Sequence, residues 1–100
     1  MKLIEFLPEA EAEHEEALAY YESERKGVGL RFQNAIAAAI RVLQSDPERP
    51  PLLPRSKCRR IRLKKFPYYV LYVVLPDHIR IIAVAHQKRK PGYWRGRPTH

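Results

Sequence analysis

The sequence predicts an α+β fold, in which an N-terminal strand and an α-helical hairpin pack on a small antiparallel β-sheet in the order β-α-α-β-β-β. Three observations carry this prediction. Apolar residues recur at helical spacing before residue 46, strand-like alternation begins near residue 59, and four prolines lie between these two regions. Helices and strands are therefore segregated along the chain, which is typical of helices that cover one face of a sheet.

The first strand runs directly into the first helix. Residues 2–7, KLIEFL, form a short run of strand length, and a helix is expected over residues 8–25. Pro8 suits the first helical position, where a missing N–H costs nothing. Carboxylates that complement the positive end of the helix dipole follow at once: Glu9, Glu11 and Glu13. Gly27 and Gly29 then mark a tight turn into a second, antiparallel helix.

The second helix has the clearest pattern, in the segment VGLRFQNAIAAAIRVLQSD at residues 28–46. Its apolar side chains fall at the spacing of one buried helical face: Phe32, Ile36, Ala39, Ile40 and Leu43. Alanines between them add helix propensity. Asp46 and Pro47 end the helix, because a residue that precedes proline is pushed out of the helical region.

Three strands are predicted after the proline-rich link of residues 46–57. The segment RRIRLKKF (59–66) alternates apolar and basic residues, PYYVLYVVL (67–75) is rich in β-branched and aromatic residues, and IRIIAVAH (79–86) follows a Pro-Asp turn. Short turns between consecutive strands favour an antiparallel meander. One face of this sheet packs on the helices, and we expect the other to carry arginines of its first strand and tyrosines of its second.

Composition and charge limit the classes of function. With 100 residues, the chain is expected to form one domain over 1–100. A lone cysteine, Cys58, excludes an internal disulfide, and the absence of a signal peptide pattern or a membrane span favours a cytoplasmic protein. The net charge is +8, with eight of 11 acidic residues before residue 25 and basic residues concentrated at 55–65 and 88–97. This asymmetry indicates an acidic partner, either nucleic acid or an acidic protein surface.

Several motifs, taken in order, resemble one known family. They are the acidic first helix ending in YYE, the second helix RFQNAIAAAIRVL closed by DP, the run CRRIRLKKFPYYVLYVV, the strand IRIIAVAH and the tail KRKPGYW. The ordered set resembles the RelE/ParE superfamily of toxins from bacterial type II toxin–antitoxin systems, closest to the ParE-like branch. The resemblance implies a small cytoplasmic toxin made together with a cognate antitoxin. RelE-like members are ribosome-dependent ribonucleases that cut messenger RNA, whereas ParE-like members inhibit DNA gyrase.

A metal-independent nuclease site needs a base, an acid and cations for the phosphorane charge. The ordinary pKa of histidine, about 6.5, suits either proton role. If the chain is a nuclease, the candidate catalytic residues are Arg62, His86, Arg89 and Tyr93. Most basic and aromatic residues also have a plainer interpretation: His86 can be a structural residue at a strand end, Arg60 and Arg62 a solvated strand face, and Trp94 an anchor for the tail.

Inhibition by binding is the favoured mechanism, with gyrase as the expected target. The binding surface is predicted to comprise Arg59, Arg60, Arg62, Lys64, His86, Lys88, Arg89, Lys90, Tyr93, Arg95 and Arg97. An acidic antitoxin is expected to neutralise it by docking on the helices or along a sheet edge, with an oligomer of the two chains as one outcome. Messenger RNA on the ribosome is the alternative target, and a non-toxic nucleic-acid-binding module is a second alternative. Neither a cofactor nor a metal is expected.

Overall fold

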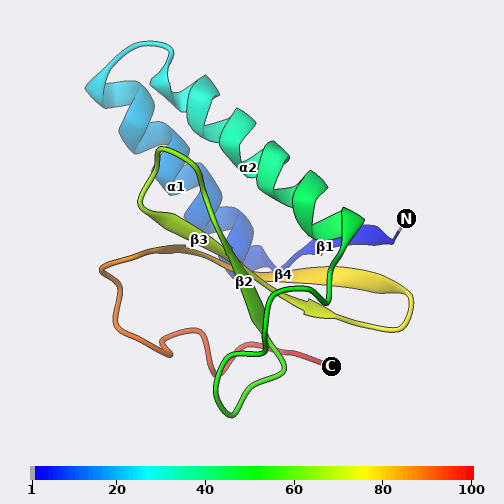
Figure 1. Cartoon of the computed structure of the whole chain (residues 1–100). Coiled ribbons are helices and arrows are strands. Elements are labelled where there is room, and N and C mark those ends of the chain that lie inside the picture. Colours follow the sequence, from blue (N-terminus) through cyan, green and yellow to red (C-terminus); the bar gives the residue numbers. More distant parts are fainter. Residues whose placement is uncertain (1) are drawn as a thin grey trace.

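The structure, a computed structural model, describes residues 2–100. The elements follow the predicted order, with β1 at Leu3–Phe6, α1 at Pro8–Glu24, α2 at Val28–Ser45, β2 at Arg59–Arg62, β3 at Tyr68–Val74 and β4 at His78–His86. The two helices pack against each other on one side of the sheet, and the C-terminal tail runs along the other side (Figure 1). The predicted α+β fold class is therefore confirmed.

The four strands form one mixed sheet in the order β1-β4-β3-β2. β2, β3 and β4 make the predicted antiparallel meander, with Ile61 opposite Val70 and Val70 opposite Val84. β1 departs from the predicted antiparallel sheet, because it pairs with β4 in parallel and places Phe6 opposite Ile81. A parallel pair needs a long crossover connection, which the helical hairpin and the first two strands of the meander supply.

A carboxylate of α1 stabilises the turn between α1 and α2. The Glu22 side chain accepts hydrogen bonds from the backbone N–H groups of Gly27 (3.1 Å) and Gly29 (3.0 Å), which satisfies free donors at the start of α2. Gly27 has a φ of 90°, a left-handed conformation that glycine adopts without strain. A Cβ atom at Gly29 would lie 2.9 Å from the Glu22 Oε1 atom and 3.1 Å from the Leu18 carbonyl oxygen, so this close packing favours glycine.

The core lies between the helices and one surface of the sheet, which we call the helix face. The predicted stripe of α2 is confirmed as buried, with Ile40 only partly so: Phe32, Ile36, Ala39 and Leu43. Around Phe32 gather the rings of Tyr21, Phe66 and Tyr68, with centroids 5.4, 5.3 and 5.2 Å from its own. Such tilted and stacked aromatic contacts stabilise the packing beyond the burial of area alone.

Strand alternation places a second set of side chains on the opposite surface, which we call the free face. β2 contributes Arg60 and Arg62 to it, and Tyr69 of β3 lies directly opposite Arg62. Tail residues 87–100 run along this side of the sheet (Figure 1), where the side chain of Trp94 is buried. The tail covers part of the free face and leaves a groove beside it.

Candidate target-binding surface

A tryptophan and an arginine hold the tail against the proline-rich link. Trp94 is only 8% exposed, which agrees with its interpretation as the anchor of the tail. Arg95 donates hydrogen bonds to the carbonyl oxygens of Pro54 (3.0 Å) and Arg55 (3.2 Å). Gly92 has a φ of 78°, a left-handed conformation that turns the chain just before Trp94. The tail and the link, distant in sequence, therefore form one rim of the groove.

The groove on the free face, which we call the cationic groove, has a volume of about 410 Å³. Its apolar lining includes Tyr69, Leu71 and Ala85, all from the free face. None of its lining residues is acidic, and five are cationic: Arg55, Arg60, Arg89, Lys90 and Arg95. A neighbouring depression shares part of this rim and adds Ser56, Lys57 and Thr99. Positive charge is thus gathered along one concave surface without an internal counter-charge.

Three arginines around the groove rest on aromatic rings. The distances from guanidinium carbon to ring centroid are 4.3 Å for Arg60 on Tyr69, 3.9 Å for Arg89 on Tyr93 and 4.9 Å for Arg95 on Trp94. An exposed contact of this kind contributes only about 0.5–1 kcal/mol. Its main effect here is to orient each guanidinium before a ligand arrives. Arg62 lies further from Tyr69, at 5.8 Å, and donates to the side chain of Gln87 at 2.9 Å.

The structure brings three of the four candidate catalytic residues to one surface, because His86, Arg89 and Tyr93 all line the cationic groove. His86 lies opposite Tyr68 in the register of β3 and β4, and the two rings pack 5.0 Å apart on the helix face. Arg62 lies on the free face beside Tyr69 and does not line that groove. The Nδ1 atom of His86 accepts a hydrogen bond from the Lys88 backbone N–H at 3.0 Å, which holds the ring at the end of the strand.

His86 also lines a second cleft, of about 550 Å³, between α1 and the ends of β3 and β4. Its walls combine aromatic rings with both signs of charge, and they include Glu16, Tyr20, Tyr21, Tyr68 and Arg89. Tyr20 is 56% exposed, so its ring is accessible from solvent. His86 and Arg89 line both this cleft and the cationic groove, so these two residues mark the ridge between them.

Tyr93 and Arg97 point their polar atoms at α1. The Tyr93 hydroxyl donates to the Glu13 carboxylate at 2.8 Å, and Arg97 forms a bidentate ion pair with the same carboxylate, both distances being 3.0 Å. Burial, and then the hydrogen bond to Glu13, raise the pKa of Tyr93 well above its ordinary value of 10.0. The hydrogen bonds that Arg97 donates to Glu13 also raise the pKa of Arg97. Tyr93 therefore lines the groove with its ring, while its hydroxyl is engaged with Glu13. Arg97 forms its ion pair inside the protein.

The other residues predicted for the surface fall into two groups. Arg59 donates to the carbonyl oxygens of Glu48 and Pro50 and braces the link. The rest are exposed, and three of them line the groove: Arg60, Arg62, Lys64, Lys88, Arg89 and Lys90. The predicted set of surface residues did not include Arg55 and Lys57, although both lie in the basic segment 55–65. Only the docking of the tail on the link brings them to this surface.

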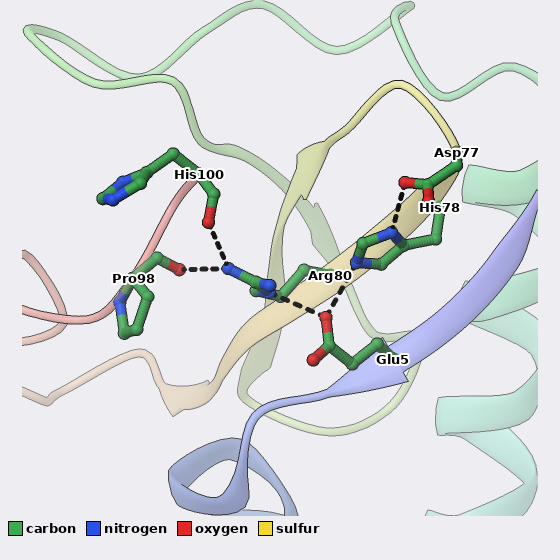
Figure 2. A network of polar contacts seen from close by, with 6 residues as sticks. All are labelled: Glu5, Asp77, His78, Arg80, Pro98 and His100. Atoms are coloured by element: carbon green, nitrogen blue, oxygen red, sulfur yellow. Dashed lines mark hydrogen bonds and ion pairs between the residues drawn. The ribbon is translucent and has the colours of Figure 1, made fainter.

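A polar network fastens the end of the tail to the free face (Figure 2). Arg80 of β4 donates to Glu5 of β1 at 2.7 Å and to the carbonyl oxygen of His100 at 2.9 Å. His78 contacts Asp77 and Glu5, each at 2.8 Å. Its hydrogen bonds to Asp77 and then Glu5 raise the pKa of His78 above 6.5. Arg80 therefore links the parallel pair of strands to the last residues of the tail.

Other kinds of site were also considered. Among residues 2–100, no three His, Cys, Asp or Glu side chains are grouped so as to hold a metal ion. In the same part of the chain, neither helix has the length and apolar character needed to cross a membrane. Cys58 is buried, and burial raises the pKa of its thiol, which disfavours the reactive thiolate.

Comparisons with known proteins agree with this architecture. A solved structure described as "Chromosomal ParDE TA system from P. aeruginosa" superimposes with a TM-score of 0.72 over 86% of this chain and 96% of that chain. The two sequences are 19% identical, so this likeness concerns the fold. A search of curated proteins finds no match. A family model described as the ParE toxin of the type II toxin–antitoxin system parDE matches residues 4–91, and the chain therefore belongs to the ParE toxin family.

Proposed function

We propose that this toxin arrests growth by binding DNA gyrase through the cationic groove on the free face of its sheet. One observation carries the proposal: the groove has five cationic lining residues, no acidic one, and three arginines already oriented on aromatic rings. Such a surface is complementary to an acidic patch on another protein. The proposed target requires the toxin to act in the bacterial cytoplasm.

The chemistry of the lining favours a protein partner. Arginine, tyrosine and tryptophan are the residues that most often dominate binding energy in protein interfaces, and Arg60, Tyr69 and Trp94 all line this groove. Exposed ion pairs contribute only about 0–1 kcal/mol each. We therefore expect charge to accelerate the encounter and the aromatic floor to supply much of the affinity. Preordered arginines also lose less side-chain entropy on binding.

Two features support binding over RNA cleavage. General acid–base catalysis needs proton-transfer groups and phosphate-binding cations around one reacting atom. Here Arg62 does not line the groove that His86, Arg89 and Tyr93 share, and the Tyr93 hydroxyl already donates to Glu13. Arg62 and the Tyr93 hydroxyl would have to move before the four candidate residues could act together.

The proposed antitoxin is an acidic chain that reaches both the groove and the helices. The cleft between α1 and the sheet offers exposed Tyr20 and half-buried Tyr21 to an apolar anchor. β2 is the last strand of the sheet and so presents a free edge to an extended segment. An acidic segment that continued into the cationic groove would neutralise the surface proposed to bind gyrase.

The proposal is tested by supplying the purified protein to gyrase supercoiling assays and, separately, to translating ribosomes. We expect inhibition of supercoiling, no position-specific cuts in messenger RNA, and relief of inhibition by the antitoxin encoded beside the gene. Cuts in messenger RNA without gyrase inhibition would establish the ribonuclease instead. Binding to bare DNA or RNA that falls steeply with salt, without either activity, would indicate a nucleic-acid-binding module.

A further inference from the structure

We propose that Glu13 is a positioning residue for target binding: its carboxylate fixes the C-terminal tail and thereby holds Arg89 at the cationic groove. The inference rests on the proposed function, because it is tested by measuring how tightly the groove binds gyrase. Glu13 lies on α1, distant from the tail in sequence, and does not line the groove itself. Its effect would pass through Tyr93 and Arg97.

Glu13 lies beside a stretch of β4 that has no neighbouring strand, and this explains why a carboxylate is useful there. β1 pairs with β4 only as far as Ile81, where the Leu7 N–H still donates to the Ile81 carbonyl oxygen at 3.1 Å. Beyond that point β4 has no strand neighbour on this edge. Its next outward groups are the carbonyl of Ile82 and the N–H of Val84. Backbone groups that are half-buried and unpaired would destabilise the edge.

Glu13 and Arg97 form hydrogen bonds with these two backbone groups. The Val84 N–H donates to Glu13 Oε1 at 3.0 Å, and Arg97 Nη1 donates to the Ile82 carbonyl oxygen at 2.9 Å. The two side chains, 15% and 16% exposed, also form a bidentate ion pair with each other. This ion pair replaces the missing strand neighbour, and it does so with one group from the helix and one from the tail.

The same carboxylate reaches the groove through one more contact. Glu13 Oε2 accepts the Tyr93 hydroxyl at 2.8 Å, and the ring of Tyr93 supports the guanidinium of Arg89 at 3.9 Å. Without the carboxylate, the Tyr93 hydroxyl loses its acceptor and Arg97 keeps only the Ile82 carbonyl oxygen, whereas Trp94 keeps its burial. The tail should therefore stay attached at Trp94 and lose its orientation on either side.

The test compares Glu13→Gln with Glu15→Gln, which makes the same charge change at an exposed position of the same helix. We expect Glu13→Gln to weaken gyrase binding about tenfold, mainly through faster dissociation, while Glu15→Gln stays near the wild type. Tyr93→Phe removes only the hydroxyl and keeps the ring under Arg89, so we expect a smaller loss, about threefold. This second variant also decides the question if Glu13→Gln does not fold.

Two further readouts distinguish positioning from general destabilisation. Hydrogen exchange should quicken in the tail and at Val84 in Glu13→Gln, and remain unchanged in the core of α2. A difference titration against Tyr93→Phe should show the Tyr93 phenol losing its proton at lower pH in Glu13→Gln than in the wild type. Wild-type gyrase affinity in Glu13→Gln, whether or not the tail exchanges faster, would overturn the inference.

Failure of the proposed function would look different. If the wild type neither binds nor inhibits gyrase, the proposed target is wrong, and the same variants are scored by growth arrest after induction. Glu13→Gln should then be less toxic than Glu15→Gln at equal expression. Equal toxicity of the two variants would overturn the role of Glu13 independently of the target.

Discussion

The two faces of the sheet are built from alternate residues of the same strands, yet they differ in almost every property. In β3, Val70 and Tyr72 are fully buried on the helix face, while Tyr69, which precedes Val70, is only half-buried under Arg60. Two helices close the helix face. A tail with little regular structure covers the free face in part, and that tail carries many of the cations.

The difference indicates a division of tasks between stability and binding. The helix face is held by apolar and aromatic contacts that exclude water. The free face is held by arginines that donate to carbonyl oxygens and carboxylates and rest on aromatic rings. Because neighbouring residues of a strand belong to different faces, substitutions should be able to change one task with little effect on the other.

The largest expected effect is on the helix face. Phe32→Ala removes a fully buried ring at the centre of the aromatic cluster and should lower the free energy of unfolding by about 3–5 kcal/mol. Urea denaturation followed by circular dichroism measures this change. Arg31→Ala, at the exposed neighbouring position, should stay within about 0.5 kcal/mol of the wild type. A similar, small loss in both variants would contradict the assignment of the core.

A smaller effect on stability is expected at the tail anchor. Trp94→Ala should lower the free energy of unfolding by about 1–3 kcal/mol, below the range for central core aromatics, because the tail can withdraw as a unit. Gyrase inhibition should nevertheless be largely lost, and Trp94→Phe should restore most of it. If inhibition by Trp94→Ala matched that of the wild type, the tail would not belong to the binding surface.

The smallest effects concern two histidines on opposite faces. His14 packs between Phe6 and Phe32, and its Nε2 atom has no hydrogen-bond partner among residues 2–100. Burial lowers the pKa of His14 below 6.5. The unfolded chain therefore takes up a proton at His14 more readily than the folded chain, so this residue reduces stability as the pH falls through 6.5.

His78, on the free face, should show the opposite dependence. Its pKa is raised, chiefly by Asp77 and then Glu5, so its stabilising contribution is complete below pH 6.5 and is lost as the pH rises through the raised value. Melting temperatures of His14→Gln and His78→Gln, measured from about pH 5 to about pH 9, check both signs. The melting temperature of His78→Gln should fall furthest below that of the wild type at acid pH. At the same pH, the melting temperature of His14→Gln should rise relative to that of the wild type. Parallel curves for the two variants would show that the faces do not differ in this way.

The elements of the fold are predictable because their signals are local. The stripe of α2 is visible within one helix, and the alternation of Ile61 and Leu63 with arginines is visible within one strand. The parallel pairing of β1 with β4 is not local, since Leu3 lies opposite His78. Nothing in the residues near Leu3 specifies which edge of the sheet that strand joins.

The site was predictable in composition and much less so in geometry. Its basic and aromatic residues are apparent from the charge distribution, but Arg97 was expected at the surface and instead pairs with Glu13. In the sequence Glu13 is one of several carboxylates at the start of a helix, and no local pattern sets it apart. Its role depends on the path of the tail, which is fixed by the burial of Trp94 and by the free edge of β4.

The most direct test of the central claim is the toxin concentration that half-inhibits gyrase supercoiling, compared between two doubly charge-reversed variants. One carries Arg60→Glu and Arg89→Glu in the groove, and the other carries Lys26→Glu and Arg41→Glu at exposed positions away from it. The net charge of the two variants is equal. The groove variant should need a concentration at least about tenfold higher than the wild type, and the other variant should stay within about threefold of it. Equal shifts in both variants, or none in the groove variant, would contradict binding through the cationic groove.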